Sequence, residues 1–255
     1  MEFRKIRNGV LVGFAATLAS TVAASATIVT VFDGIAAGRA SFDATVVAAG
    51  SVVDNDVLTG LVSGVSIVRP DFTITGNGGF TSVYGQYGTM SGESITINPA
   101  GGGSNPRTDP MDYFASGLTF TFNAAVNAIG FEVGDWATCC QGPTTDLFIS
   151  FDGGAPILVA SDNMGAGQFP SQDGSGNLVN EIFVAAFDDT GDFTSVSFWG
   201  NGIGEVLVAG GDIRYALLDR GTLPPDPSAI PLPAAGWLMM AGLAGMAALR
   251  RRKAA

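Results

Sequence analysis

Short apolar runs with a period of two residues constrain this chain most, because they recur through residues 27–222. Leu118, Phe120 and Phe122 alternate with polar neighbours, and the alternation returns less cleanly in residues 147–151. A period of two places successive side chains on opposite faces of a β-strand. Further strands are expected at residues 28–32, 72–75, 94–97, 128–133, 157–160, 182–187, 193–199, 206–208 and 213–217.

Glycine-rich turns separate these runs, for example at residues 76–79, 101–106, 152–154 and 200–202. Many short strands joined by such turns predict an all-β fold, an antiparallel β-sandwich or jelly roll, over residues 27–222. No interior segment has the pattern of an amphipathic helix. Residues 27–117 are less periodic, and we expect them to supply the remaining strands of the same domain. A separate small domain is the alternative.

The N-terminus has the three parts of a signal peptide. A basic region at residues 4–7 precedes an apolar run at residues 10–22 and the small residues Ala24-Ser25-Ala26. The apolar run is shorter than the roughly 20 residues that cross a bilayer, which argues against the alternative of a permanent anchor. We therefore expect signal peptidase to remove residues 1–26 and the mature chain to begin at Thr27.

The C-terminus also has three parts: a proline-rich linker at residues 223–233, an apolar segment at 234–249, and the basic run Arg250-Arg251-Arg252-Lys253. The basic run would stay on the cytoplasmic side of the membrane. As a helix, the apolar segment would be about 24 Å long, against a hydrocarbon core of roughly 30 Å. Residues 234–255 are therefore expected to be a transmembrane helix held briefly for processing, with an ordinary membrane helix as the alternative.

The sequence Ile230-Pro231-Leu232-Pro233-Ala234, followed by the apolar segment and the arginines Arg250, Arg251 and Arg252, resembles the PEP-CTERM class of sorting signals. It is most similar to the variant named for Val-Pro-Leu-Pro-Ala, with Ile230 in place of the valine. The resemblance implies recognition by an exosortase, a membrane-embedded cysteine protease of Gram-negative bacteria. It also implies association with the cell envelope and its exopolysaccharide.

The part of the chain from Leu118 onward resembles a recurrent β-sandwich of exported bacterial proteins that carry such tails. Residues 122, 126–131, 147–153, 193–198 and 212–215 carry this likeness. Related jelly rolls include carbohydrate-binding modules, although a shared fold does not fix a function.

Composition excludes several kinds of chemistry. The chain has no histidine, and its two lysines, Lys5 and Lys253, lie outside the expected domain. Serine–histidine–aspartate triads, histidine zinc sites and Schiff-base lysines are therefore excluded there. Residues 27–227 hold five arginines and 22 acidic residues, a net charge of −17, which disfavours nucleic acid and anionic lipid surfaces. We do not expect an enzyme, because no residue is marked as a nucleophile. With 22 acids, a carboxylate pair at glycosidase spacing would arise by chance and so would not indicate one.

Acidic residues are candidate ligands for a structural calcium ion, which prefers oxygen donors. Asp188, Asp189 and Asp192 fall within one expected loop. The likeness to carbohydrate-binding jelly rolls adds Asp33 and Asp212, because such domains often hold calcium between their first and last strands. The alternative is that these are ordinary solvated turn residues.

Two pairs of residues complete the candidates. Cys139 and Cys140 are adjacent, and the chain has no other cysteine. A disulfide between them would be strained, and a redox switch or an intermolecular link is the alternative. Trp136 and Trp199 could stack on sugar rings if exposed, whereas packing in or beside the core is the alternative.

Together these features predict an exported protein of the cell envelope or extracellular matrix. It would be sorted by an exosortase and have a structural, adhesive or exopolysaccharide-associated role. The alternative function is that of a carbohydrate-binding module, or less readily a polysaccharide hydrolase.

Overall fold

The computed structural model describes residues 27–97, 109–136, 145–162, 180–200 and 207–223. Its strands form two sheets, and each strand pairing among these residues is antiparallel. The prediction of an all-β protein built from antiparallel sheets is confirmed.

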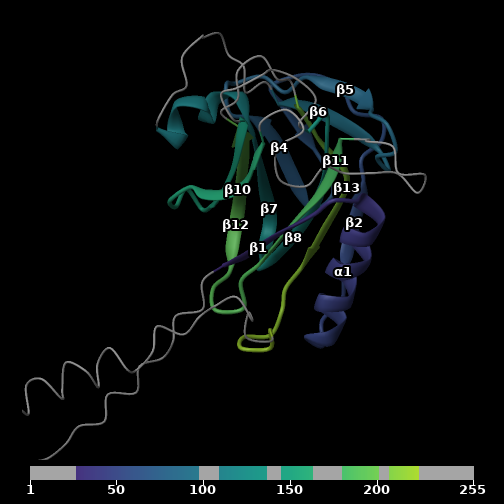
Figure 1. The fold of residues 1–255 in the computed structure, drawn as a ribbon, viewed down its shortest axis with the longest axis vertical. Coiled ribbons are helices and arrows are strands. Elements are labelled where there is room, and N and C mark those ends of the chain that lie inside the picture. Colours follow the sequence, from purple (N-terminus) through teal and green to yellow (C-terminus); the bar gives the residue numbers. More distant parts are fainter. Residues whose placement is uncertain (1–26, 98–108, 137–144, 163–179, 201–206, 224–255) are drawn as a thin grey trace, which may run out of the picture.

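Both sheets combine strands from the two halves of the chain (Figure 1). The seven-stranded sheet has the order β1 (Ile28–Phe32), β11 (Glu181–Phe187), β8 (Ala128–Gly134), β13 (Leu207–Ala216), β6 (Glu93–Ile97) and β5 (Val83–Gln86), and β2 (Asp54–Val57) also pairs with β13. The six-stranded sheet has the order β10 (Ile157–Asp162), β9 (Thr145–Phe151), β12 (Phe193–Gly200), β7 (Leu118–Val126), β4 (Phe72–Gly76) and β3 (Ser66–Val68).

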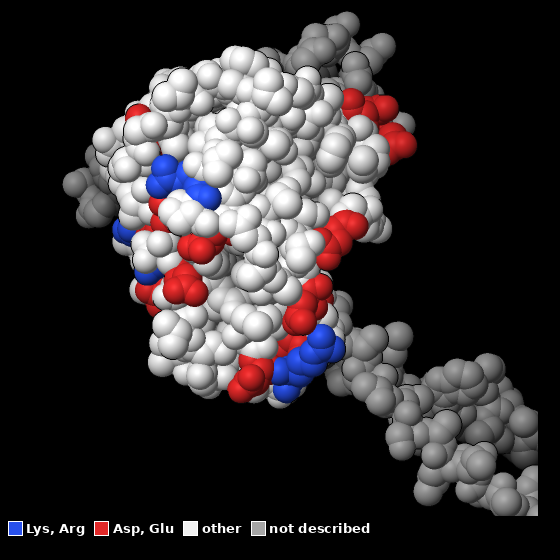
Figure 2. Space-filling model, turned by 180° about the vertical axis from the view of Figure 1, so that it is seen from behind, with Lys and Arg blue, Asp and Glu red and all other residues white. Residues whose placement is uncertain are grey.

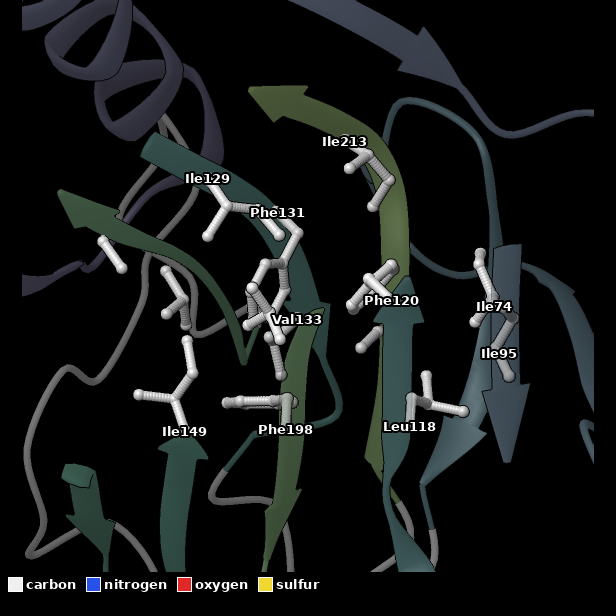
Figure 3. Close-up of a cluster of buried hydrophobic side chains, with 14 of the residues drawn as sticks. Ile74, Ile95, Leu118, Phe120, Ile129, Phe131, Val133, Ile149, Phe198 and Ile213 are labelled. Carbon is white, nitrogen blue, oxygen red and sulfur yellow. The ribbon is translucent and has the colours of Figure 1, made fainter. Parts of the chain in front are cut away.

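Aromatic side chains from both sheets meet in the main core (Figure 3). The ring of Phe131 on β8 lies 5.7 Å from that of Phe120 on β7 and 4.9 Å from that of Phe198 on β12. All three side chains are fully buried. Because alternate residues of each strand point inward, the period of two seen in the sequence becomes one continuous apolar layer between the sheets.

The helix α1 (Ile35–Ala48) lies on the outer side of the seven-stranded sheet (Figure 1). The expectation of no interior helix was wrong. The buried residues of α1 are Ile35, Gly38, Phe42 and Val46, at helical intervals of three and four. Phe42 stacks on Phe187 of β11, with ring centroids 5.1 Å apart. Several alanines around the helix reduce the contrast between its faces, which concealed this pattern in the sequence.

A second, shorter helix covers part of the six-stranded sheet. The 3₁₀ helix η1 (Pro110–Ser116) begins after Asp109, whose side chain accepts a hydrogen bond from the backbone N–H of Met111 at 2.9 Å. Within the described residues, no helix is long and apolar enough to cross a membrane. The predicted signal peptide at 1–26 and the predicted transmembrane segment at 234–255 lie outside those residues.

β13 is one strand where the sequence predicted two, at 206–208 and 213–217. Gly210 and Gly211 have φ values of +139° and +67°, and they form an irregularity that joins the two parts. A Cβ atom on Gly211 would clash with the carboxylate of Glu132, so this position has no room for a side chain. Before the irregularity β13 pairs with β6, and after it with β2.

Candidate functional site

The loop at residues 188–192, between β11 and β12, binds the start of the described chain. Oδ2 of Asp188 accepts a hydrogen bond from the Thr27 hydroxyl at 3.1 Å. Oδ1 of Asp188 accepts bonds from the Thr190 hydroxyl and from the N–H groups of Thr190 and Gly191, at 2.6, 2.9 and 3.1 Å. Burial raises the pKa of Asp188, but these hydrogen bonds outweigh it and hold the pKa below its ordinary value.

The same loop binds the end of the described chain. Asp189, which is 4% exposed, accepts a hydrogen bond from the N–H of Leu223 through Oδ2 at 2.8 Å. Arg220 donates to the carbonyl oxygen of Thr190 at 3.1 Å and pairs with Asp192 at 3.2 Å. The 188–192 loop therefore holds both ends of the sandwich together.

The structure does not bring together all of the predicted calcium ligands. Asp33 is exposed at the end of β1, whereas Asp212 lies on β13, and β11 and β8 lie between these two strands. Three strand spacings amount to about 14 Å, too far for one ion to bind both carboxylates. No group of three acidic residues suited to a metal occurs within the described part of the chain. Calcium binding at the 188–192 loop stays a prediction, and an ion there would have to displace the hydrogen bonds described above.

A second charged region lies between α1 and the outer face of the seven-stranded sheet. This α1 charge cluster consists of Arg39, Asp43, Glu132, Asp212 and Arg214. Glu132 alternates along β8 with core-facing residues, so its side chain points outward, yet it is fully buried. The Nη1 atom of Arg39 lies 3.8 Å from Oε1 of Glu132 and 3.6 Å from Oδ2 of Asp212, so one guanidinium lies close to two carboxylates.

Arg214 connects two elements through this cluster. Its guanidinium donates two hydrogen bonds to the Asp43 carboxylate of α1, at 2.8 and 2.6 Å. A third, of 2.5 Å, goes to Asp212 on its own strand, which is 2% exposed. Asn55 of β2 donates to the other oxygen of Asp212 at 2.9 Å. The cluster therefore fastens α1 to β13 by an ion pair, and Asn55 joins β2 to β13 by a hydrogen bond to the Asp212 carboxylate.

Two buried glutamates hold the segment at residues 87–92, which connects β5 to β6. Oε2 of Glu132 accepts from the N–H of Ser91 at 2.7 Å, and Oε1 of Glu181 accepts from the N–H of Thr89 at 2.6 Å. A Cβ atom on Gly88 would clash with the Glu181 carboxylate, which explains the glycine. Oε1 of Glu132 has no hydrogen-bond partner among the described residues and relies on Arg39.

Replacing Glu132 with Gln is expected to flatten the pH dependence of stability above about pH 4.5. Burial raises the pKa of Glu132 in the folded protein, and Asp212 adds to this, whereas Ser91 and Arg39 lower it by less. The folded state then binds the proton more tightly than the unfolded chain does. The contribution of Glu132 to stability is therefore fully present below its pKa in the unfolded chain. It is lost as the pH rises through its pKa in the folded protein.

Urea unfolding at intervals between about pH 4 and pH 8 would measure this effect. Asp152→Asn is the matched control. Burial raises the pKa of Asp152, but hydrogen bonds from Thr194 and Ser195 together lower it by more, so its pKa lies below the ordinary value. Its contribution to stability is therefore lost as the pH falls. Identical profiles for the wild type and Glu132→Gln above about pH 4.5 would contradict the role given to Glu132.

The two predicted sugar-stacking tryptophans are fully buried. Trp199 stacks against Phe148 with ring centroids 6.0 Å apart, meets Phe114 edge-on at 5.1 Å, and donates its Nε1–H to the carbonyl oxygen of Pro110 at 2.7 Å. Trp136 belongs to the main core. Neither ring is exposed for stacking on a sugar. Both tryptophans instead pack in or beside the core, which was the alternative.

Among the described residues, exposed aromatic rings occur instead at Phe80 and Tyr84, which are 61% and 57% exposed. Tyr84 lies on β5, at one end of the seven-stranded sheet, and Phe80 lies shortly before it. Neither residue could be predicted as exposed from the sequence, because a lone aromatic in an irregular segment carries no sign of its exposure.

Several predicted residues lie outside the described part of the chain. These are the two cysteines, Cys139 and Cys140, and the sorting motif with its basic run, Ile230–Ala234 and Arg250–Arg252. The disulfide, the linker and the tail therefore stay predictions.

Most of the surface shown in Figure 2 is uncharged, and the arginines on that face lie beside acidic side chains. Among the described residues, no exposed basic patch is seen on this face, in keeping with the acidic composition. No model of a known protein family matches the chain, and no curated protein matches it.

Proposed function

We propose that this protein is exported and sorted by an exosortase-type enzyme to the envelope or extracellular matrix of a Gram-negative bacterium. There its sandwich has a structural, adhesive or exopolysaccharide-associated role. The order of the C-terminal parts carries the proposal: prolines with the Ile230–Ala234 motif, then a short apolar segment, then Arg250–Arg252. In the same proposal, the sandwich is a jelly roll and residues 234–255 form a transmembrane helix until processing.

The geometry of the 188–192 loop supports this arrangement. Thr27, the expected first residue of the mature chain, and Leu223, where the linker begins, are both bound to this loop. A signal peptide and a membrane tail that leave from the same place let the rest of the sandwich extend away from the membrane. The fully covered core is suited to a displayed domain that must remain folded outside the cell.

Replacing Pro231 and Pro233 with Ala is expected to block removal of the tail. The two prolines favour an extended motif that a membrane protease can bind, and alanine lets the chain join the following helix. Intact-mass measurement of the protein from fractionated native cells checks this. Wild-type protein should lack residues 1–26 and the basic run, whereas the variant should keep the basic run and stay with the inner membrane.

The matched control is Pro224→Ala with Pro225→Ala, which removes two prolines of the same linker outside the motif and should leave processing unchanged. Wild-type protein found in the cytosol with residues 237–255 attached would refute the proposal.

A further inference from the structure

Thr27 and Asp188 each lie one residue beyond the paired parts of β1 and β11. β1 pairs with β11 so that Ile28 faces Phe187, and the same register places Thr27 opposite Asp188. The 3.1 Å hydrogen bond between the Thr27 hydroxyl and Oδ2 of Asp188 agrees with this register. Directly opposed residues have Cβ atoms about 4.5–5.5 Å apart, so the polar atoms of Thr27 lie close to this carboxylate.

We infer that the 188–192 loop is a binding site for the processed N-terminus, where the new α-ammonium group of Thr27 pairs with the Asp188 carboxylate. This inference rests on the proposed export, which requires cleavage after Ala26. Hydrolysis of that peptide bond consumes one water, leaves a carboxylate on Ala26 and gives Thr27 a free amine. The amine takes up a proton at neutral pH, because α-amino groups have pKa values of about 7.7–8.0.

The charges of the loop favour such a partner. Of its three aspartates, Asp192 pairs with Arg220, whose side chain is 65% exposed, and no other ion pair of this loop occurs among the described residues. Oδ1 of Asp188 already accepts three hydrogen bonds within the loop, which fix the carboxylate in place. Oδ2 is turned to Thr27. An ammonium group there adds a positive charge beside an excess of negative charge, and it needs no rearrangement of the loop.

The pair would fasten a weakly held strand. In the described structure β1 pairs with β11 alone, at one end of the seven-stranded sheet. A precursor that still carries Ala26 has an uncharged peptide nitrogen at this position. Cleavage therefore completes the attachment of β1, and the mature protein becomes more stable than its precursor.

Acetylation of the mature protein tests this directly. The α-amine of Thr27 is the sole primary amine in residues 27–252, because the lysines are Lys5 and Lys253. We expect acetylation of protein recovered from cells to lower the melting temperature by about 2–4 °C, the shift that corresponds to about 1 kcal/mol in a domain of this size. It should also speed hydrogen exchange of the β1 amides.

Asp188→Asn is the decisive variant, because asparagine keeps an oxygen for the loop hydrogen bonds but removes the charge. Acetylation should not change its melting temperature. In the matched control Asp192→Asn, which loses a different acid of the same loop, acetylation should have the wild-type effect. Such a cycle isolates the coupling between the two groups.

The outcomes separate the two proposals. If the mature protein begins at Thr27 but acetylation lowers the melting temperature of the wild type and of Asp188→Asn equally, the ion pair is refuted and the sorting proposal stands. A protein whose mass shows that residues 1–26 are retained refutes export processing itself. If Asp188→Asn does not fold, unchanged exchange of the β1 amides on acetylation of the wild type refutes the ion pair.

Discussion

Replacing Arg214 with Leu is expected to lower the free energy of unfolding by about 3–5 kcal/mol, the range for removing one partner of a buried ion pair. Asp212 is 2% exposed, and Arg214 is its closest cation among the described residues, at 2.5 Å. Without the guanidinium, the carboxylate stays buried with Arg39 at 3.6 Å as its remaining cation. Urea unfolding followed by circular dichroism would show a lower midpoint at an unchanged m value.

Arg220→Leu is the matched control. This arginine also pairs with an aspartate, but its side chain is 65% exposed, so the loss should be at most about 1 kcal/mol. A further variant with both Arg214 and Asp212 replaced by Leu should recover part of the lost stability, because no buried charge is then left unpaired at this position. Equal losses for Arg214→Leu and Arg220→Leu would show that the α1 charge cluster does not stabilise the fold.

Replacing Trp199 with Ala should cost about 3–5 kcal/mol, the usual range for deleting a buried large aromatic side chain. The indole fills the space between β12 and η1 and satisfies the carbonyl oxygen of Pro110. Alanine would leave both a cavity and an unpaired carbonyl group. The same urea measurement, followed by far-ultraviolet circular dichroism, gives the change without relying on tryptophan fluorescence.

Phe80→Ala provides the comparison for an exposed aromatic, with an expected change within about 0.5 kcal/mol. Comparing the two variants tests whether the loss of stability depends on burial, because Phe80 is 61% exposed and Trp199 is not exposed at all. A Trp199→Ala protein as stable as the wild type would mean that the indole does not pack as described.

The central strands could be predicted from the sequence because their inward side chains form the core. The predicted segments at 128–133 and 193–199 correspond to β8 and β12, each within one residue at either end. Ile129, Phe131 and Val133 of β8 recur at every second position, as do Val196 and Phe198 of β12, and burial of one face requires that pattern whatever the partner strands are. The less regular β2, β3 and β5 were missed, because their exposed residues carry little pattern.

The outer face of the seven-stranded sheet could not be predicted in the same way. Glu132 points away from the core, and in an isolated sheet it would be in water. Its burial depends on α1 and on the 87–92 segment, which lie far from it in the sequence. Asp212 was predicted as a calcium ligand from the likeness to carbohydrate-binding jelly rolls. An acid on a strand does not reveal that Arg214, two residues later, will pair with it.

The candidate site was predicted in part. The 188–192 loop was recognised as a cluster of acids, but the partners of these acids are the two ends of the domain. Such contacts depend on the order of strands in the sheet, which local sequence patterns do not specify. The sorting motif, in contrast, could be proposed from sequence alone, because a protease recognises it as a short linear segment.

The position of β13 has a mechanical consequence for a protein tethered by its C-terminus. Tension on the tail enters the sandwich through β13, which must separate from β8, β6 and β2 before it can move. Tension on the other end reaches β1, which in the described structure has β11 as its single partner. The end that leads to the proposed anchor is therefore the one better built to bear a load.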